Sequence, residues 1–103
     1  QDLDLMIVIG GYNSSNTRNL ARLAGKHIPT YHIADATCLV SHRKIRHHPV
    51  DHAQLAPSVT AETVTLNWLP SPQLIRLGLT AGASTPDSVV GLVIERLELL
   101  AAK

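Results

Sequence analysis

The residues of this chain that are best suited to bind an anion lie in two short polar segments. Residues 10–16 read GGYNSSN and residues 80–86 read TAGASTP. Their glycines let a ligand approach the backbone N–H groups closely, and their hydroxyls and amides add directed hydrogen-bond donors. Neither segment contains lysine or follows the GxxxxGK[ST] or GxGxxG patterns of nucleotide-binding loops. Uncharged donors favour a small diphosphate over ATP or a nicotinamide cofactor, and the candidate side chains are Ser14, Ser15, Asn16 and Ser84.

Each polar segment stands between an expected strand and an expected helix. Residues 5–9 (LMIVI) form a continuous apolar run, which is typical of a strand buried on both faces of a parallel sheet. Residues 74–79 predict a second strand of this kind. The turns that follow parallel strands lie together at the carboxyl edge of the sheet, and the helix N-termini there favour anions. We therefore expect the two segments to face one another and to hold one anion.

The same residue types also cap helices. Ser, Thr and Asn are the usual N-cap residues, so either segment taken alone fits simple capping better than ligand binding. Residues 13–16 precede a helical pattern over residues 17–24, and Thr85-Pro86-Asp87 is a typical helix start. Two such segments at one edge shift the balance towards a ligand site, while capping stays open as the alternative.

The periodicity of the chain predicts a small α/β fold. Residues 29–33 indicate a short strand after the first helix, and residues 87–100 carry the apolar stripe of a C-terminal helix. We expect a single domain over residues 1–103 with three layers, αβα. Its centre is a parallel sheet of three or four strands with the first strand central, and helices cover both faces.

The middle of the chain, residues 34–73, shows no long periodic pattern. Residues 36–40 fit a helical turn, and residues 62–68 fit a strand or a turn. The segment also holds a cluster of histidines in basic surroundings, at His42, His47, His48 and His52. Their spacing matches no established zinc site, so we expect no metal there and instead a solvated or interdomain surface.

Four further residues have simple expected roles. Cys38 is the single cysteine, which excludes an internal disulfide and is typical of a reducing compartment. We expect it to act as a small buried hydrophobe. Trp68 is expected to be a packing anchor rather than a stacking platform. His27 and His32 flank the strand over residues 29–33, and no chemistry is expected from them.

Composition excludes two classes of partner. The formal net charge is +1, charged residues make up 17% and aromatic residues 3%, which leaves neither a basic stripe nor a stacking platform for nucleic acid. The apolar run over residues 5–9 is too short to cross a bilayer, and no basic segment precedes it as in a signal peptide. We expect no nucleic acid and no membrane as partner.

Read with the strands before them, the two polar segments resemble motifs of one enzyme family. Residues 4–17 (DLMIVIGGYNSSNT) are similar to the GGxNSSNT segment of the LytB/IspH family, the hydroxymethylbutenyl diphosphate reductases, and residues 79–87 (LTAGASTPD) to its T[AS]GASTPD segment. Residues 45–49 (IRHHP) and 67–70 (NWLP) resemble the longer loop of the plant and cyanobacterial branch. The resemblance covers nearly the whole chain but only the last of the family's three pseudo-symmetric α/β domains.

The resemblance implies a function in isoprenoid synthesis by the non-mevalonate pathway. The family reductively removes the hydroxyl of 4-hydroxy-3-methylbut-2-enyl diphosphate, which gives isopentenyl and dimethylallyl diphosphates. A 4Fe-4S cluster on three cysteines and a proton-donating glutamate are expected in the missing N-terminal domains, with ferredoxin or flavodoxin as electron donor. The expected location is the bacterial cytoplasm or the plastid stroma. The residues that the resemblance places on the substrate diphosphate are Ser14, Ser15, Asn16 and Ser84.

The chain alone is expected to be inactive. It starts at Gln1 rather than at Met, and we expect a fragment of a longer protein or a processed one. It holds one cysteine where the family needs three, so neither a catalytic residue nor a metal ligand is expected in it. Two other hypotheses stay open. One is a stand-alone module that binds phosphate or diphosphate without redox chemistry, and the other is a structural remnant whose helices are merely capped.

Overall fold

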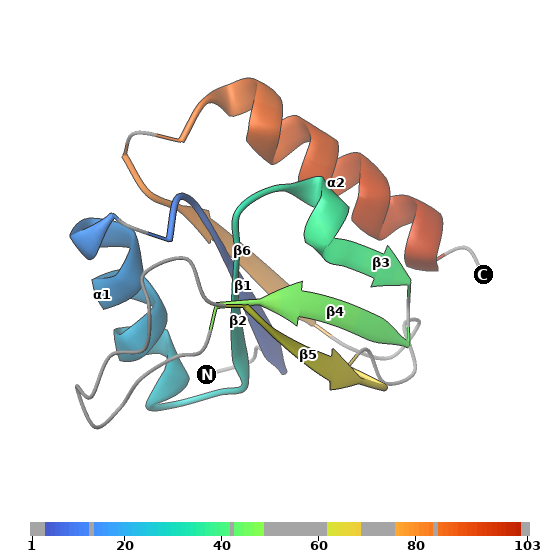
Figure 1. The fold of residues 1–103 in the computed structure, drawn as a ribbon, viewed down its shortest axis with the longest axis horizontal. Helices are drawn as coiled ribbons and strands as arrows, with labels where there is room; N and C mark the ends of the chain where they lie inside the picture. The colour runs from blue at the N-terminus through green and yellow to red at the C-terminus, as the bar shows by residue number, and fades with distance from the viewer. Residues whose placement is uncertain are drawn as a thin grey trace.

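The computed structural model describes residues 4–12, 14–41, 43–48, 62–68, 76–83 and 85–101. These residues form two helices, six strands and one short 3-10 helix, arranged as Figure 1 shows. In chain order the elements are β1 (Leu5–Ile9), α1 (Ser15–Gly25), β2 (Thr30–Ile33), η1 (Ala36–Cys38), β3 (Leu39–Ser41), β4 (Lys44–His47), β5 (Thr63–Leu66), β6 (Leu77–Ala81) and α2 (Asp87–Ala101).

Strand β1 is the centre of a parallel sheet with the order β2-β1-β6. Its last residue, Ile9, stands opposite Ile33 of β2 and Ala81 of β6. A central strand in such a sheet is covered on both faces, which explains why all of its residues are apolar. The parallel sheet with the first strand central is thereby confirmed. Residues 74 and 75, which were expected in the last strand, lie outside the described residues.

The parallel sheet has a helix on each side. Because side chains alternate along a strand, Ile7 and Ile9 of β1 share one face, where they join the buried cluster that includes Val93 of α2. Val8 points to the other face and is also fully buried. Helix α1 packs along β1 and β2, and its buried residue Ala21 lies outside that cluster. The predicted αβα layering is confirmed.

A second sheet occupies part of the segment that showed no firm pattern. Strands β3, β4 and β5 pair antiparallel in that order, and η1 precedes them (Figure 1). The helical turn expected near residues 36–40 and the strand expected within residues 62–68 are both found. The expectation of a single parallel sheet was incomplete because these strands are only three or four residues long. Such short strands leave little alternation to detect.

Three contacts join the second sheet to the rest of the fold. The backbone N–H of His48 donates to the carbonyl of His32 in β2 at 2.8 Å. Trp68, which follows β5, is 3% exposed, and its ring meets Tyr31 of β2 edge-on at 5.8 Å, which confirms its role as a packing anchor. The Arg96 guanidinium of α2 donates to backbone carbonyls of β3. The two sheets and α2 therefore share one core.

The histidine cluster does not form a solvated surface where the structure describes it. His47 and His48 are 8% and 4% exposed, so the expectation was wrong for these two, while His42 and His52 lie outside the described residues. The imidazoles are covered because β4 packs against β2, where Tyr31 meets the ring of His47 edge-on at 4.8 Å. Cys38 is 2% exposed, which confirms it as a small buried residue.

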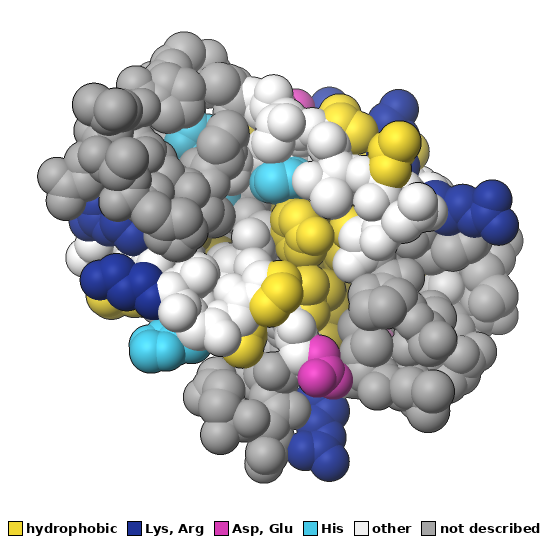
Figure 2. All heavy atoms as spheres, turned by 90° about the horizontal axis from the view of Figure 1, so that it is seen from below, with side chains coloured by type: hydrophobic (Ala, Val, Ile, Leu, Met, Phe, Trp, Pro, Cys, Tyr) yellow, Lys and Arg dark blue, Asp and Glu magenta, His cyan; other side chains and the backbone are white. Residues whose placement is uncertain are grey.

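The described surface carries dispersed charge. On the face seen in Figure 2, Lys and Arg side chains stand at separate places around the rim, and hydrophobic side chains reach the surface in a strip near the middle. This face therefore offers no continuous basic stripe in the described part of the chain. Among the same residues, no helix combines the length and apolar character needed to cross a membrane.

Candidate functional site

The two polar segments meet at the carboxyl edge of the parallel sheet. The N–H of Gly82 donates to the Ile9 carbonyl at 3.0 Å, and the N–H of Gly10 donates to the Ile33 carbonyl at 3.0 Å. The turn after β1 and the turn after β6 are thus direct neighbours, as the topology of parallel strands predicted.

Two threonines, Thr17 and Thr85, contact both of these turns. Sequence reasoning did not assign them to the site. Thr17 is fully buried, and its hydroxyl occupies the space where Gly10 and Gly82 approach each other. A Cβ on Gly10 would lie 2.7 Å from that Oγ1, and a Cβ on Gly82 would overlap it. The Thr85 hydroxyl donates to the Ile9 carbonyl at 3.1 Å. The available signal was that both motifs contain a threonine shortly after their glycines.

This close packing makes Gly82 sensitive to substitution. Gly82→Ala is expected to lower the free energy of unfolding by about 1–3 kcal/mol, because the new methyl group meets the buried Thr17 hydroxyl. Urea denaturation measures the loss. Gly91→Ala is the matched control: its Cβ would meet open space within α2, so a gain of about 0.5–1 kcal/mol is expected. The loss from Gly82→Ala should shrink in a Thr17→Ala background, and equal losses in both backgrounds contradict the assigned contact.

Ser14 combines a capping role with a free donor. Its hydroxyl oxygen accepts from the Thr17 N–H at 3.3 Å and from the Thr17 hydroxyl at 3.1 Å. A serine oxygen has two acceptor lone pairs and one O–H, so these bonds use its acceptors and leave its proton to donate. The capping interpretation is confirmed for Ser14, and it does not compete with ligand binding.

Ser15 and Asn16 follow in the first turn of α1, with both side chains exposed. Backbone N–H groups in a first turn have no intrahelical partner and carry the positive end of the helix dipole. The structure therefore brings three of the four candidate residues together at one helix N-terminus. The fourth, Ser84, lies outside the described residues, while Gly82 and Thr85 near it belong to the adjoining turn.

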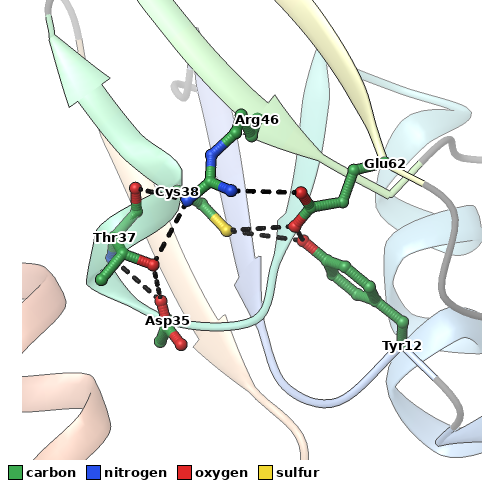
Figure 3. A network of polar contacts seen from close by, with 6 residues as sticks. All are labelled: Tyr12, Asp35, Thr37, Cys38, Arg46 and Glu62. Atoms are coloured by element: carbon green, nitrogen blue, oxygen red, sulfur yellow. Dashed lines mark hydrogen bonds and ion pairs between the residues drawn. The ribbon is translucent and has the colours of Figure 1, made fainter.

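A network of polar contacts ties the first turn to the second sheet (Figure 3). The Tyr12 hydroxyl donates to Glu62 Oε2 at 2.7 Å and lies 3.4 Å from Cys38 Sγ. Glu62 pairs with Arg46 at 3.4 Å, and Arg46 donates to the Thr37 carbonyl at 3.0 Å. Burial, and then the bonds to Cys38 and Glu62, raise the pKa of Tyr12, so it stays a neutral donor. Sequence reasoning missed this network because its members come from separate segments.

The described residues around the sheet edge include no group of side chains that could ligate a metal ion. Within the part of the chain that the structure describes, no three His, Cys, Asp or Glu side chains gather closely enough to hold a metal ion. The arrangement at the sheet edge instead offers hydroxyl, amide and backbone donors.

The parallel sheet, with one glycine turn after β1 (Gly10–Gly11) and a second after β6 (Gly82) at its carboxyl edge, defines a small α/β domain. The chain belongs to the LytB family, whose model, described as LytB protein, matches residues 1–98. The family resemblance seen in the sequence is confirmed.

Curated relatives and one solved structure agree with this family. Two 4-hydroxy-3-methylbut-2-enyl diphosphate reductases, from Picosynechococcus sp. and Thermosynechococcus vestitus, are each 45% identical over 98 residues, covering 94% of this chain and 22% of theirs. The solved structure of an (E)-4-hydroxy-3-methyl-but-2-enyl diphosphate reductase, the terminal enzyme of the non-mevalonate pathway, matches with a TM-score of 0.58 and 30% identity. That match covers 95% of this chain and 26% of the other. The chain is thus homologous to part of these reductases and spans about a fifth of the curated relatives' length.

Proposed function

We propose that this chain is the diphosphate-holding C-terminal part of a 4-hydroxy-3-methylbut-2-enyl diphosphate reductase. The observation that carries the proposal is the direct contact of two glycine turns at one sheet edge, next to a helix N-terminus with exposed donors. The homology to reductases of this name supports the choice of ligand. The residues proposed to bind the diphosphate are Ser14, Ser15, Asn16 and Ser84.

The chemistry of these donors suits a diphosphate. Its oxygens accept only, so every contact needs a donor, and the Ser14 O–H is left available by the cap geometry. Each hydrogen bond to a charged group contributes about 1.5–3 kcal/mol. A few donors from one wall of the pocket therefore give weak binding, and we expect the remainder of the relatives' length to supply the opposite wall.

The family's reductive step uses a 4Fe-4S cluster, and the residues of this chain do not fit one. Three thiolates are required, whereas the chain has a single cysteine. Cys38 is 2% exposed, and its Sγ is in contact with Tyr12 and Glu62. The part proposed for this chain is therefore to bind and orient the diphosphate.

Titration calorimetry with inorganic diphosphate and with the allylic diphosphate tests the proposal on the 103-residue chain. Asn16→Ala is expected to weaken binding about 10-fold or more, because one donor to a charged ligand is lost. Asn19→Ala is the matched control, since Asn19 is exposed on the same helix and bonds Arg22 instead. No binding by the unaltered chain contradicts the proposal and favours simple capping.

A substitution at Ser14 separates capping from binding. Asp caps helices as well as Ser does, so Ser14→Asp is expected to keep stability while replacing the free donor with a negative charge. Diphosphate binding should then be abolished at unchanged urea midpoint. Ser14→Ala combined with Ser84→Ala should also remove most binding, and retained affinity in these variants removes both serines from the site.

A further inference from the structure

The imidazole of His32 lies against the glycine turn after β1, at Gly10. His32 belongs to β2, is 1% exposed, and places Nε2 3.0 Å from the Gly10 carbonyl oxygen. A carbonyl only accepts, so Nε2 carries the proton and donates. The other ring nitrogen, Nδ1, is buried and has no hydrogen-bond partner among the described residues.

We propose that His32 is a positioning residue for the anion site. Its Nε2–H bond to the Gly10 carbonyl fixes the Gly10–Gly11 peptide with the Gly11 N–H turned outward as a donor to the ligand. This inference deepens the proposed function and rests on it.

The orientation of the Gly10–Gly11 peptide follows from the position of the His32 ring. In a planar trans peptide the C=O and the N–H point in opposite directions. The Gly10 carbonyl points to the buried imidazole, so the Gly11 N–H of the same peptide points away from the interior. Gly10 is buried and Gly11 is exposed, which agrees with this orientation. A peptide between two glycines has the widest choice of backbone angles, so an external bond is needed to hold one orientation.

Surrounding groups hold the imidazole in place. The Tyr12 ring meets it edge-on at 5.1 Å, and the His48 ring meets it at 5.5 Å and 84°. Tyr12 itself is anchored through its hydroxyl to Glu62 (Figure 3). The N–H of Gly10 donates to the carbonyl of Ile33, the residue after His32. Strand β2 therefore bonds Gly10 twice, through the Ile33 backbone and through the His32 side chain. Glu62, which precedes β5 of the second sheet, thereby supports the turn after β1 through Tyr12.

A matched pair of variants tests the proposal. Gln can place a side-chain N–H near the position of Nε2, whereas Leu fills similar space without a donor. His32→Leu is expected to weaken binding of inorganic diphosphate about 10- to 100-fold, and His32→Gln to stay within about threefold of the unaltered chain. Circular dichroism checks that both variants are folded. Equal affinity of the Leu variant and the unaltered chain, or equal weakening in both variants, overturns the proposal.

Nuclear magnetic resonance supplies a readout that does not depend on ligand. The ring ¹⁵N spectrum should show a proton on Nε2, and the Gly11 amide resonance should move in His32→Leu but stay near its place in His32→Gln. A proton on Nδ1, or a Gly11 amide unaffected by His32→Leu, overturns the positioning role. If the unaltered chain binds no diphosphate while these spectral signs are present, the proposed function fails and the fixed peptide orientation stands.

Discussion

Acidification from about pH 6.5 to about pH 4 is expected to lower the free energy of unfolding by as much as about 3 kcal/mol. Burial lowers the pKa of His32 from 6.5 to about 4, and the charges of His48 and Arg18 act in the same direction against the opposing bond to Gly10. In this pH window the unfolded chain binds a proton at His32 and the folded chain does not. Stability therefore rises with pH across the window and is lost as pH falls.

His47 adds to the same trend, because burial also lowers its pKa. Urea denaturation at pH 7 and at pH 4 measures the difference. His32→Gln should flatten the profile in part, because it removes the buried imidazole. A free energy of unfolding that is the same at both pH values contradicts the buried, uncharged state of His32.

Ile45→Ala is expected to lower the free energy of unfolding by about 2–5 kcal/mol. Ile45 belongs to β4 of the second sheet and is fully buried in the cluster that also contains Ile7 and Val93. Truncating it removes apolar contacts and leaves a cavity where both sheets and α2 meet. Urea or thermal unfolding followed by circular dichroism gives the value.

The control for this experiment is Leu66→Ala. Leu66 lies on the neighbouring strand β5 but is 66% exposed, so its truncation should change stability by no more than about 0.5 kcal/mol. Similar losses at the two positions would mean that the second sheet does not contribute to the common core. A single cooperative transition that shifts as a whole in Ile45→Ala supports one shared core.

Long apolar runs and helix caps made much of the fold predictable. The run over residues 5–9 indicated a doubly covered strand, and β1 is the central strand of its sheet. Ser14 caps α1, which begins one residue later. The adjacency of the two glycine turns followed from strand topology alone. These features depend on local sequence patterns or on a general rule of parallel sheets, and a single sequence is enough to apply either.

The rest depends on contacts between segments that no local pattern links. Tyr12 and Glu62 are fifty positions apart, and their hydrogen bond exists only once β5 lies beside β4. No chemistry was expected from His32 because its neighbours in sequence suggest none, whereas its partner Gly10 lies in the turn after another strand, β1. Thr17 fits an ordinary helix pattern, and its hydroxyl gains importance only where two glycine backbones converge on it.

The register of β1 has a consequence for the order in which the molecule assembles. Leu5 pairs with Leu77, so two segments that are far apart in the sequence must find each other before the sheet is complete. Local units such as β1-α1-β2 can form early, whereas this distant pairing closes late because it carries a large loop-closure entropy. The glycine turns touch only across that last pairing. The proposed anion site would therefore be completed only at the final stage of folding, when the two turns come into contact.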